Sequence, residues 1–242
     1  MPDISILLCA MVLLSVLSLS ATSSDAKSET NAPGTYKILT DDKTKVTIPF
    51  KMLHNKPVME AKINGKQAFL TIDNGKLWDE AWLFGTALSE DIALEEGSEG
   101  TIEGAGDGES TQASFANNLC ISFDGIEFYN QSAYISPASA GFAGAFKGMD
   151  GQICNTFFSH FVVEFDFHQG LIILHDPASF RYSGEGSVLD IKRESSGSCS
   201  LPISFTLADG KKYQGRADMD LGGVEVFMVA LNNHNMIEWT NV

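Results

Sequence analysis

The sequence has little cysteine, little basic charge and no long apolar run after its first twenty residues. Its four cysteines include no Cys-x-x-Cys pair, which excludes the common structural zinc patterns. Lys and Arg number 16 against 31 Asp and Glu, so the formal net charge is −15. Because this charge would repel a phosphate backbone and no Lys/Arg cluster offsets it, nucleic acid is not an expected partner.

Two further catalytic patterns are missing. The sequence has no Gly-x-Ser-x-Gly motif to anchor a Ser-His-Asp hydrolase. His160, Glu164 and His168 are equally spaced, as metal ligands sometimes are. In a strand, however, residues four apart lie about 13 Å from each other, too far to share one ion. Neither a metal nor another cofactor is therefore expected.

The one long apolar run lies at the N-terminus. It extends over Ile4–Leu19 and is followed by small residues and a polar tract, Thr22–Asn31. This pattern predicts a signal peptide over residues 1–21, a disordered linker over 22–34 and export from the cytoplasm to the periplasm or exterior. The run is short for a membrane span, but its leading segment carries Asp3 and no Lys or Arg, so an uncleaved membrane anchor is the alternative.

The cysteines that follow the signal segment are Cys120, Cys154 and Cys199. Their number is odd, so at least one thiol stays unpaired within the chain. We expect small buried residues with at most one disulfide.

Beyond residue 31 the periodicity is that of strands. Short runs rich in Val, Ile, Phe and Tyr are bounded by turn residues, which predicts an all-β fold. The predicted strands are Val46–Phe50, Val58–Ile63, Ala68–Ile72, Ser114–Phe123, Ala133–Ile135, Phe161–Phe167, Leu171–Leu174, Leu201–Leu207 and Val224–Val229. The predicted hairpin turns are Asn64-Gly65, Asp124-Gly125, Gln169-Gly170 and Asp209-Gly210. Only Trp82–Leu94 and Asn155–His160 are predicted to be helical.

A weak internal repeat involves two of these hairpins. Val58–Gly75 and Ile203–Gly222 each consist of a strand, a Gly-Lys turn, a returning strand and an Asp-x-Gly sequence. In each copy the aspartate, Asp73 or Asp220, leaves the end of the returning strand. Pseudo-symmetric packing of the two copies would bring the two carboxyl groups together.

Two adjacent carboxyl groups carry a defined chemistry. Like charges so close cannot both ionise readily, so the pair shares one proton. The ionised member takes a proton from a bridging water while the protonated member polarises a substrate carbonyl. Such a pair hydrolyses peptide bonds with neither a metal nor a covalent nucleophile. Asp218 is an alternative to Asp220, and an ordinary turn is the alternative interpretation of Asp73.

These residues resemble the aspartic peptidases, in particular retropepsin-like and pepsin-like proteins of the exported bacterial type. Phe69–Gly75 matches the family's hydrophobic strand ending in Asp-Thr/Ser-Gly, except at the middle residue. Met149–Phe158, followed by Phe161–Asp166, resembles the family's second half-lobe element, in which a hydrophobic-hydrophobic-Gly turn precedes a short helix and a strand. Leu171–Phe180 resembles the closing hairpin of the lobe.

The resemblance implies an acid-protease-like β-barrel lobe over residues 35–186 and a partial second, pseudo-symmetric lobe over 187–242. It implies a polypeptide substrate and the catalytic pair Asp73 and Asp220. The residues implied to form the supporting loops are Asn74, Gly75, Leu221 and Gly222. The residues at the position of the family's substrate-covering flap are Gly104, Ala105, Gly106, Asp107 and Gly108, for which a plain loop is the alternative.

The sequence departs from the family pattern at four positions. Asn74 and Leu221 replace the hydroxyl residues that lock the two loops together; an amide both donates and accepts hydrogen bonds, whereas leucine does neither. Lys76 replaces a small residue, and Cys154 replaces a glycine. Few residues follow Asp220, which suggests a truncated or vestigial second lobe.

Two functional hypotheses follow from these observations. The first is an aspartic-type endopeptidase acting outside the cytoplasm. The second is a catalytically inactive β module of the same fold, which binds a peptide or a protein partner in the same cleft.

Overall fold

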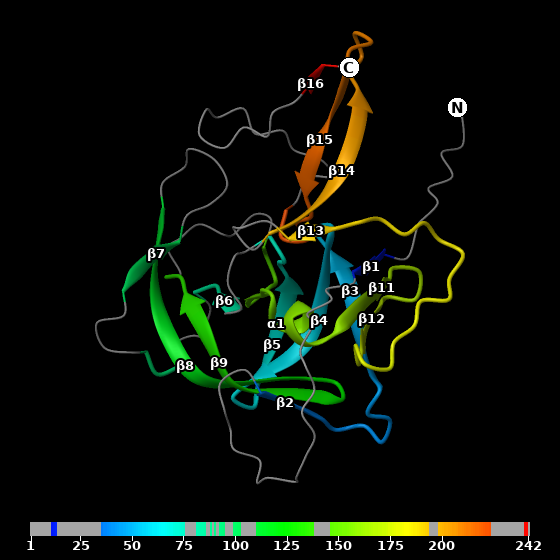
Figure 1. The fold of residues 1–242 in the computed structure, drawn as a ribbon. Helices are drawn as coiled ribbons and strands as arrows, with labels where there is room; N and C mark the ends of the chain where they lie inside the picture. The colour runs from blue at the N-terminus through cyan, green and yellow to red at the C-terminus, as the bar shows by residue number, and fades with distance from the viewer. Residues whose placement is uncertain are drawn as a thin grey trace.

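The computed structural model describes residues 35–75, 81–85, 88, 90, 92–94, 99–102, 110–137, 146–193 and 198–223, with the backbone of 11–13 and 240–241. Over these residues the chain forms a large mixed sheet of twelve strands, a second sheet of four strands and one short helix (Figure 1). The predicted all-β fold class is confirmed.

The strands are β1 (Met11–Leu13), β2 (Thr35–Ile38), β3 (Lys45–Leu53), β4 (Lys56–Ile63), β5 (Lys66–Ile72), β6 (Ala81–Leu83), β7 (Gly100–Ile102), β8 (Thr111–Phe123), β9 (Ile126–Ile135), β10 (Gly151–Ile153), β11 (Val162–Asp166), β12 (Leu171–His175), β13 (Lys192–Arg193), β14 (Cys199–Thr206), β15 (Lys212–Asp218) and β16 (Thr240–Asn241). The helix is α1 (Thr156–His160). The predicted strands up to residue 207 all coincide with or overlap these elements, and Val224–Val229 lies outside the described residues.

The large sheet is built around an antiparallel β3–β4–β5 meander. Alternate residues Val46, Ile48 and Phe50 of β3 are buried and the residues between them are exposed, as expected for a strand with one face on the core. β5 then pairs in parallel with β10, which pairs with β6, and β6 with β9. The parallel β5–β10 pair supports the end of β5, where Asp73 follows.

The four predicted hairpin turns are confirmed. Gly65, Gly125, Gly170 and Gly210 all have positive φ angles, between 69° and 85°. Tight hairpins need this backbone region, which glycine enters without a steric penalty. The sequence analysis missed a fifth turn, His54-Asn55, in which both residues have positive φ and which joins β3 to β4.

The main core lies inside the large sheet and is rich in phenylalanine. The rings of Phe123, Phe128 and Phe157 pack with centroid separations of 5.2 to 6.4 Å. Phe157 comes from α1, so the helix closes one side of this core. The prediction of a helix at Asn155–His160 is therefore confirmed, with α1 beginning one residue later.

The prediction of a helix over Trp82–Leu94 is wrong. Residues 81–83 form β6, between β9 and β10, and the other described residues of this segment contain no α-helix. Every residue of β6 is buried, so the strand shows no alternation of polar and apolar residues. Short apolar runs of this kind cannot be distinguished from buried helix by periodicity.

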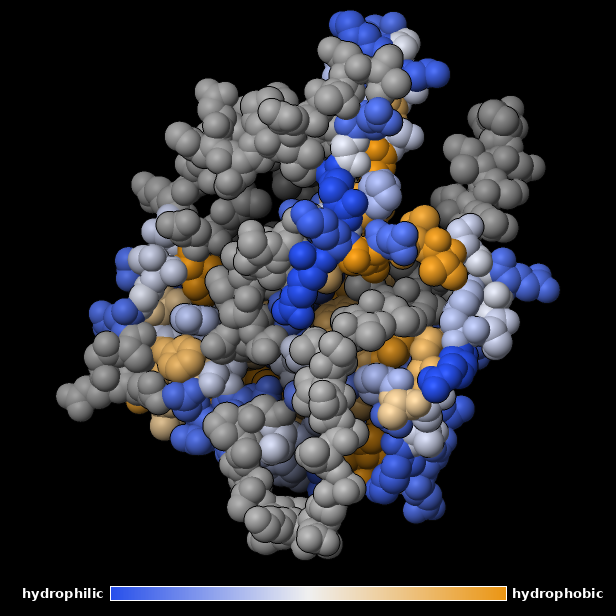
Figure 2. All heavy atoms as spheres, in the orientation of Figure 1, coloured by the Kyte–Doolittle hydropathy of each residue, from blue (hydrophilic) through white to orange (hydrophobic). Residues whose placement is uncertain are grey.

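The second sheet has the strand order β13-β14-β15-β16 and carries Asp220 just beyond β15. Its β14–β15 hairpin projects away from the large sheet (Figure 1), and hydrophilic side chains predominate at its tip (Figure 2). The predicted boundary at residues 186–187 falls between β12 and β13, where the described chain forms no strand.

The segment predicted to be a signal peptide contributes β1, which pairs with β11. Among the described residues, no helix has the length and apolar character needed to cross a membrane. Cys120 and Cys199 have free thiols, and Cys154 is fully buried.

Candidate active site

Asp73 lies directly after β5, on the support that β10 provides. Its backbone N–H donates to the Ile153 carbonyl at 2.9 Å, which continues the parallel β5–β10 ladder by one residue. The residue is only 5% exposed. The last three residues of β5, Leu70–Ile72, are all buried, and the strand leads into a carboxyl group held at the edge of the core.

Asp220 lies two residues beyond β15. The Met219 N–H donates to the Cys199 carbonyl at 2.8 Å, so the β14–β15 pairing extends to the residue before Asp220. Asp220 itself is exposed. The alternative, Asp218, is still part of the strand and accepts a hydrogen bond from the Ser198 hydroxyl at 3.2 Å. Of the two acids, the structure brings Asp220 to the Asp73 loop.

The two Asp-x-Gly loops approach each other reciprocally. A Cβ placed on Gly75 would lie 2.6 Å from the Asp220 carboxyl carbon, and one on Gly222 would lie closer still to the Asp73 carboxyl. Each carboxyl group therefore covers the glycine of the opposite loop. A side chain at either position would therefore displace the carboxyl group of the opposite loop.

Each loop also has the same internal hydrogen bond. The Gly75 N–H donates to Asp73 Oδ1 at 3.0 Å, and the Gly222 N–H donates to Asp220 Oδ1 at 2.7 Å. The weak repeat in the sequence thus corresponds to two loops with the same geometry.

Asn74 joins the two loops. Its Nδ2 donates to the Met219 carbonyl at 3.0 Å, and its Oδ1 accepts the Leu221 N–H at 2.8 Å. The amide is 5% exposed, so both bonds are shielded from water. The Leu221 side chain instead packs against the main core. The two loops are thus joined by the side-chain amide of Asn74 in the first loop, which bonds main-chain groups of the second.

The sequence analysis missed Lys56, which begins β4 and is fully buried. Its Nζ donates to the carbonyls of Gly222 and Gly223, the latter at 3.1 Å, and lies 5.0 Å from the centroid of the Phe146 ring. A lysine after a hairpin turn is normally exposed, so the sequence carried no signal for this contact.

Gln152 was also missed. It lies in the middle of β10, is 1% exposed, and donates from Nε2 to Asp73 Oδ2. Its Oε1 is buried and has no hydrogen-bond partner among the described residues. The segment Met149–Phe158 also contains Asp150, Asn155 and Thr156, so the polarity of Gln152 gave no distinct signal in the sequence.

Two further parts of the predicted site, the flap and Lys76, are not described by the structure. Gly104–Gly108, the predicted flap, and Lys76 lie outside the described residues. β7 and β8 pair on either side of the flap segment, with Ile102 opposite Thr111. Cys154 is described and is fully buried immediately after β10.

The evenly spaced residues His160, Glu164 and His168 have separate surroundings. Glu164 Oε2 lies 2.8 Å from His175 Nε2, across the β11–β12 pair. The His160 ring packs on Tyr36 at 5.1 Å. Within the described part of the chain, no three acidic, His or Cys side chains are grouped as metal ligands.

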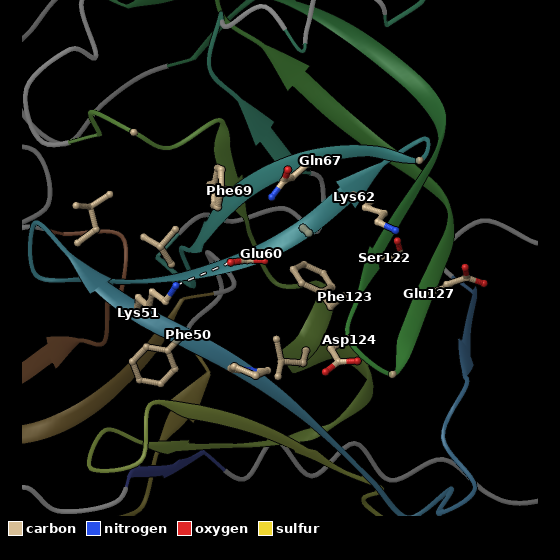
Figure 3. A pocket seen from close by; sticks show the side chains of 18 of the residues that line it. Phe50, Lys51, Glu60, Lys62, Gln67, Phe69, Ser122, Phe123, Asp124 and Glu127 are labelled. Carbon is tan, nitrogen blue, oxygen red and sulfur yellow. Dashed lines mark ion pairs between the residues drawn. The ribbon is translucent and has the colours of Figure 1, made fainter.

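A large cavity lies away from the two loops. An open cavity of about 1240 Å³ lies between β3, β4, β5 and the β8–β9 turn. Figure 3 shows the side chains that line it. Its lining includes Phe50, Phe69 and Phe123 and the ion pair of Lys51 with Glu60, at 4.0 Å. None of the predicted catalytic or loop residues lines it.

No protein-family model and no curated protein matches this sequence. Among solved structures, the chain is similar to a retropepsin-like aspartic protease from Rickettsia conorii, with a TM-score of 0.39 and 12% sequence identity. The similarity covers 59% of this chain and 94% of that one. A likeness so distant carries no argument about activity, so function is inferred from the two loops.

Proposed function

We propose that the chain is an aspartic-type endopeptidase in which Asp73 and Asp220 activate one water molecule between them. The observation that carries this proposal is the reciprocal contact of the two loops, in which each carboxyl group covers the glycine of the other. Because each carboxyl group lies against the opposite glycine, the two acids are close to each other. Stability alone does not require two adjacent carboxyl groups, because like charges repel.

The chemistry follows from one shared proton. The ionised carboxylate accepts a proton from water as the water oxygen attacks the peptide carbonyl carbon. The protonated carboxyl gives its proton to the carbonyl oxygen, which forms a tetrahedral diol. One carboxyl group then gives its proton to the amide nitrogen as the C–N bond breaks, and the other carboxylate takes a proton from a diol hydroxyl, so the pair again holds one proton.

The surroundings favour a fixed geometry for this pair. Asn74 locks the loops together, and Lys56 holds the main chain of the second loop through two carbonyl groups. Catalytic groups act efficiently only when their positions are held by such supporting contacts.

The test is hydrolysis of an unfolded protein between pH 3 and pH 7. Asp73→Asn and Asp220→Asn are each expected to lower kcat/KM at least about 10³-fold, because each removes one member of the acid–base pair. Asp218→Asn is the matched control and is expected to retain activity. Full activity in either of the first two variants would contradict the proposal.

The second candidate is a catalytically inactive module that binds peptide at the same loops. The observation that favours it is Leu221, which supplies no side-chain hydrogen bond to the lattice between the loops. A peptide carrying a tetrahedral hydroxyl in place of one carbonyl separates the two candidates. An endopeptidase binds it much more tightly than the parent peptide, whereas a simple binding module has no reason to do so.

We also propose that the enzyme acts outside the cytoplasm and consists of the lobes 35–186 and 187–242. N-terminal sequencing of the protein recovered from its native cells tests the first point. A mature chain that begins near residue 22 would support export, and one that retains Met1 would favour the uncleaved anchor.

A further inference from the structure

We propose that Gln152 is a positioning residue that holds Asp73 as the ionised member of the pair, so that Asp220 carries the shared proton. This inference rests on the proposed function, because it assigns the two roles within the proposed dyad.

The Asp73 carboxyl group accepts two hydrogen bonds, one at each oxygen. Gly75 donates its backbone N–H to Oδ1, and Gln152 donates from Nε2 to Oδ2. Both carboxyl oxygens therefore face N–H groups. A carboxylate, which only accepts, binds both donors at full strength; protonation would place a hydrogen on one of the two oxygens and weaken its bond to the facing N–H group.

At the other end of the Gln152 amide, the buried Oε1 has no hydrogen-bond partner among the described residues. If the amide were reversed, Oε1 would face Asp73 and would suit a protonated carboxyl. In the structure Nε2 is the group that faces Asp73, and Oε1 has no partner among the described residues. The contact therefore matches the charged form of Asp73.

The two acids differ in burial. Asp73 is 5% exposed and Asp220 is exposed, so burial alone would favour the neutral form at Asp73. Hydrogen bonds to a carboxylate act in the opposite direction. Gln152 approaches Asp73 and makes no described contact with Asp220, which makes the two acids unequal in spite of their matching loops.

The charged side chains of Lys56 and Asp150, near Asp73, have other hydrogen-bond partners in the structure. Lys56, on β4, bonds the Gly222 and Gly223 carbonyls, and Gly222 lies against the Asp73 carboxyl. Asp150, just before β10, accepts the Phe69 N–H at 2.9 Å, four residues before Asp73. These groups and Asp220 remain unchanged when Gln152 is replaced.

The test compares Gln152→Met with Thr71→Val. Methionine has nearly the length of glutamine but no donor. Thr71 lies opposite Gln152 in the β5–β10 pair, is fully buried and donates to the Pro57 carbonyl, so its replacement also removes a buried hydrogen bond. Equal thermal unfolding midpoints of the two variants would show that they disturb the fold equally.

The readout is the pH profile of kcat/KM. In Gln152→Met the acid limb is expected to move to higher pH by about one unit, because Asp73 must be ionised and has lost a donor. The alkaline limb, which reports the proton on Asp220, is expected to move much less. Thr71→Val should leave both limbs in place. An acid limb that stays in place, or moves to lower pH, in folded Gln152→Met would overturn the inference.

A second readout separates this inference from the proposed function. The carboxyl carbons of Asp73 and Asp220 are titrated by NMR and assigned through Asp73→Asn and Asp220→Asn. Asp73 is expected to ionise at lower pH than Asp220, and Gln152→Met to narrow the gap. If that order holds in a chain that cleaves no peptide, the proposed function fails and the assignment of the proton stands. If Asp220 ionises first, the assignment fails whatever the activity.

Discussion

Leu221 and Asn74 are 147 residues apart in sequence, yet the Leu221 backbone N–H donates to the Asn74 side-chain oxygen at 2.8 Å. The same amide donates to the Met219 carbonyl on the other side of Asp220. The second acid is therefore bracketed by two hydrogen bonds to one side chain of the first loop. This relationship makes Asn74 the first residue to test.

Asn74→Ala is expected to lower the free energy of unfolding by about 2–4 kcal/mol, because two hydrogen bonds are lost and two main-chain groups lose their partner. Asn74→Thr should recover part of the loss, because a hydroxyl also donates and accepts. Urea unfolding measures both variants. Gln67→Ala, at an exposed position of β5, is the control and should change stability by less than about 0.5 kcal/mol. If Asn74→Ala and Gln67→Ala were equally stable, the two hydrogen bonds of Asn74 would not stabilise the contact between the loops.

Gly75→Ala is expected to be disruptive because its methyl group would lie 2.6 Å from the Asp220 carboxyl carbon. We expect a loss of stability of about 1–3 kcal/mol and a loss of peptidase activity of about 10²-fold, since the acids would be forced apart. Gly100→Ala is the matched control, because a methyl group there meets no atom within 4 Å. Both variants are measured by urea unfolding and by peptide hydrolysis. A Gly75→Ala enzyme with normal activity would show that the loops do not need this contact.

Lys56→Met removes a buried ammonium that holds the Gly222 and Gly223 carbonyls. Hydrogen bonds to charged groups contribute about 1.5–3 kcal/mol each, and methionine regains some apolar burial, so we expect a net loss of about 2–4 kcal/mol. Urea unfolding is the measurement. Lys51→Met is the control, because the Lys51 side chain is 90% exposed and its pair with Glu60 spans 4.0 Å. Such surface pairs contribute little. If Lys56→Met were as stable as Lys51→Met, the bonds from Lys56 to the Gly222 and Gly223 carbonyls would not stabilise the fold.

Asp166 gives the fold a pH dependence at the β11–β12 turn. Hydrogen bonds from the backbone and side chain of Gln169, and from the His168 backbone, lower the pKa of Asp166 below its usual value. As pH falls, the unfolded chain binds this proton first. The stabilisation is thus present above pH of about 4 and is lost as pH falls through the folded-state pKa.

Urea midpoints of wild type and Asp166→Ala test this dependence between pH 7 and pH 2. We expect wild type to be the more stable at pH 7 and the two proteins to converge near pH 2. A difference that persists undiminished at pH 2 would mean that the carboxylate is not its source.

Much of the fold could be predicted because local signals agreed with it. The turn glycines Gly65 and Gly210 mark hairpins whose strands alternate visibly in the sequence, and each hairpin ends in the Asp-x-Gly sequence. The approach of the second acid to the first loop followed from the repeat alone. Trp82 was misassigned because a strand buried on both faces has no alternation to detect.

The supporting residues could not be predicted in the same way. Lys56 and Gln152 are long polar side chains whose burial depends on tertiary packing, and they contact carbonyl and carboxyl groups distant in sequence. Composition and periodicity describe which face of a strand is buried, not what a buried polar atom meets. Gln152 lies among other polar residues, Asp150, Asn155 and Thr156, so its sequence context did not distinguish it.

The hydrogen bonds from Asn74 and Lys56 to the second loop determine which amino-acid substitutions that loop tolerates. Asn74 and Lys56 bond the carbonyls of residues 219, 222 and 223 and the N–H of residue 221, all of them main-chain atoms that every amino acid except proline possesses. A library randomised at these positions should therefore favour glycine at 222, where a Cβ would meet the Asp73 carboxyl, and apolar side chains at 221, where Leu221 packs against the main core. In this loop only Asp220 and Gly222 would then be required for their side chains' chemistry or size. The shape of the loop is held by Asn74 and Lys56, which belong to the part of the chain that forms the large sheet.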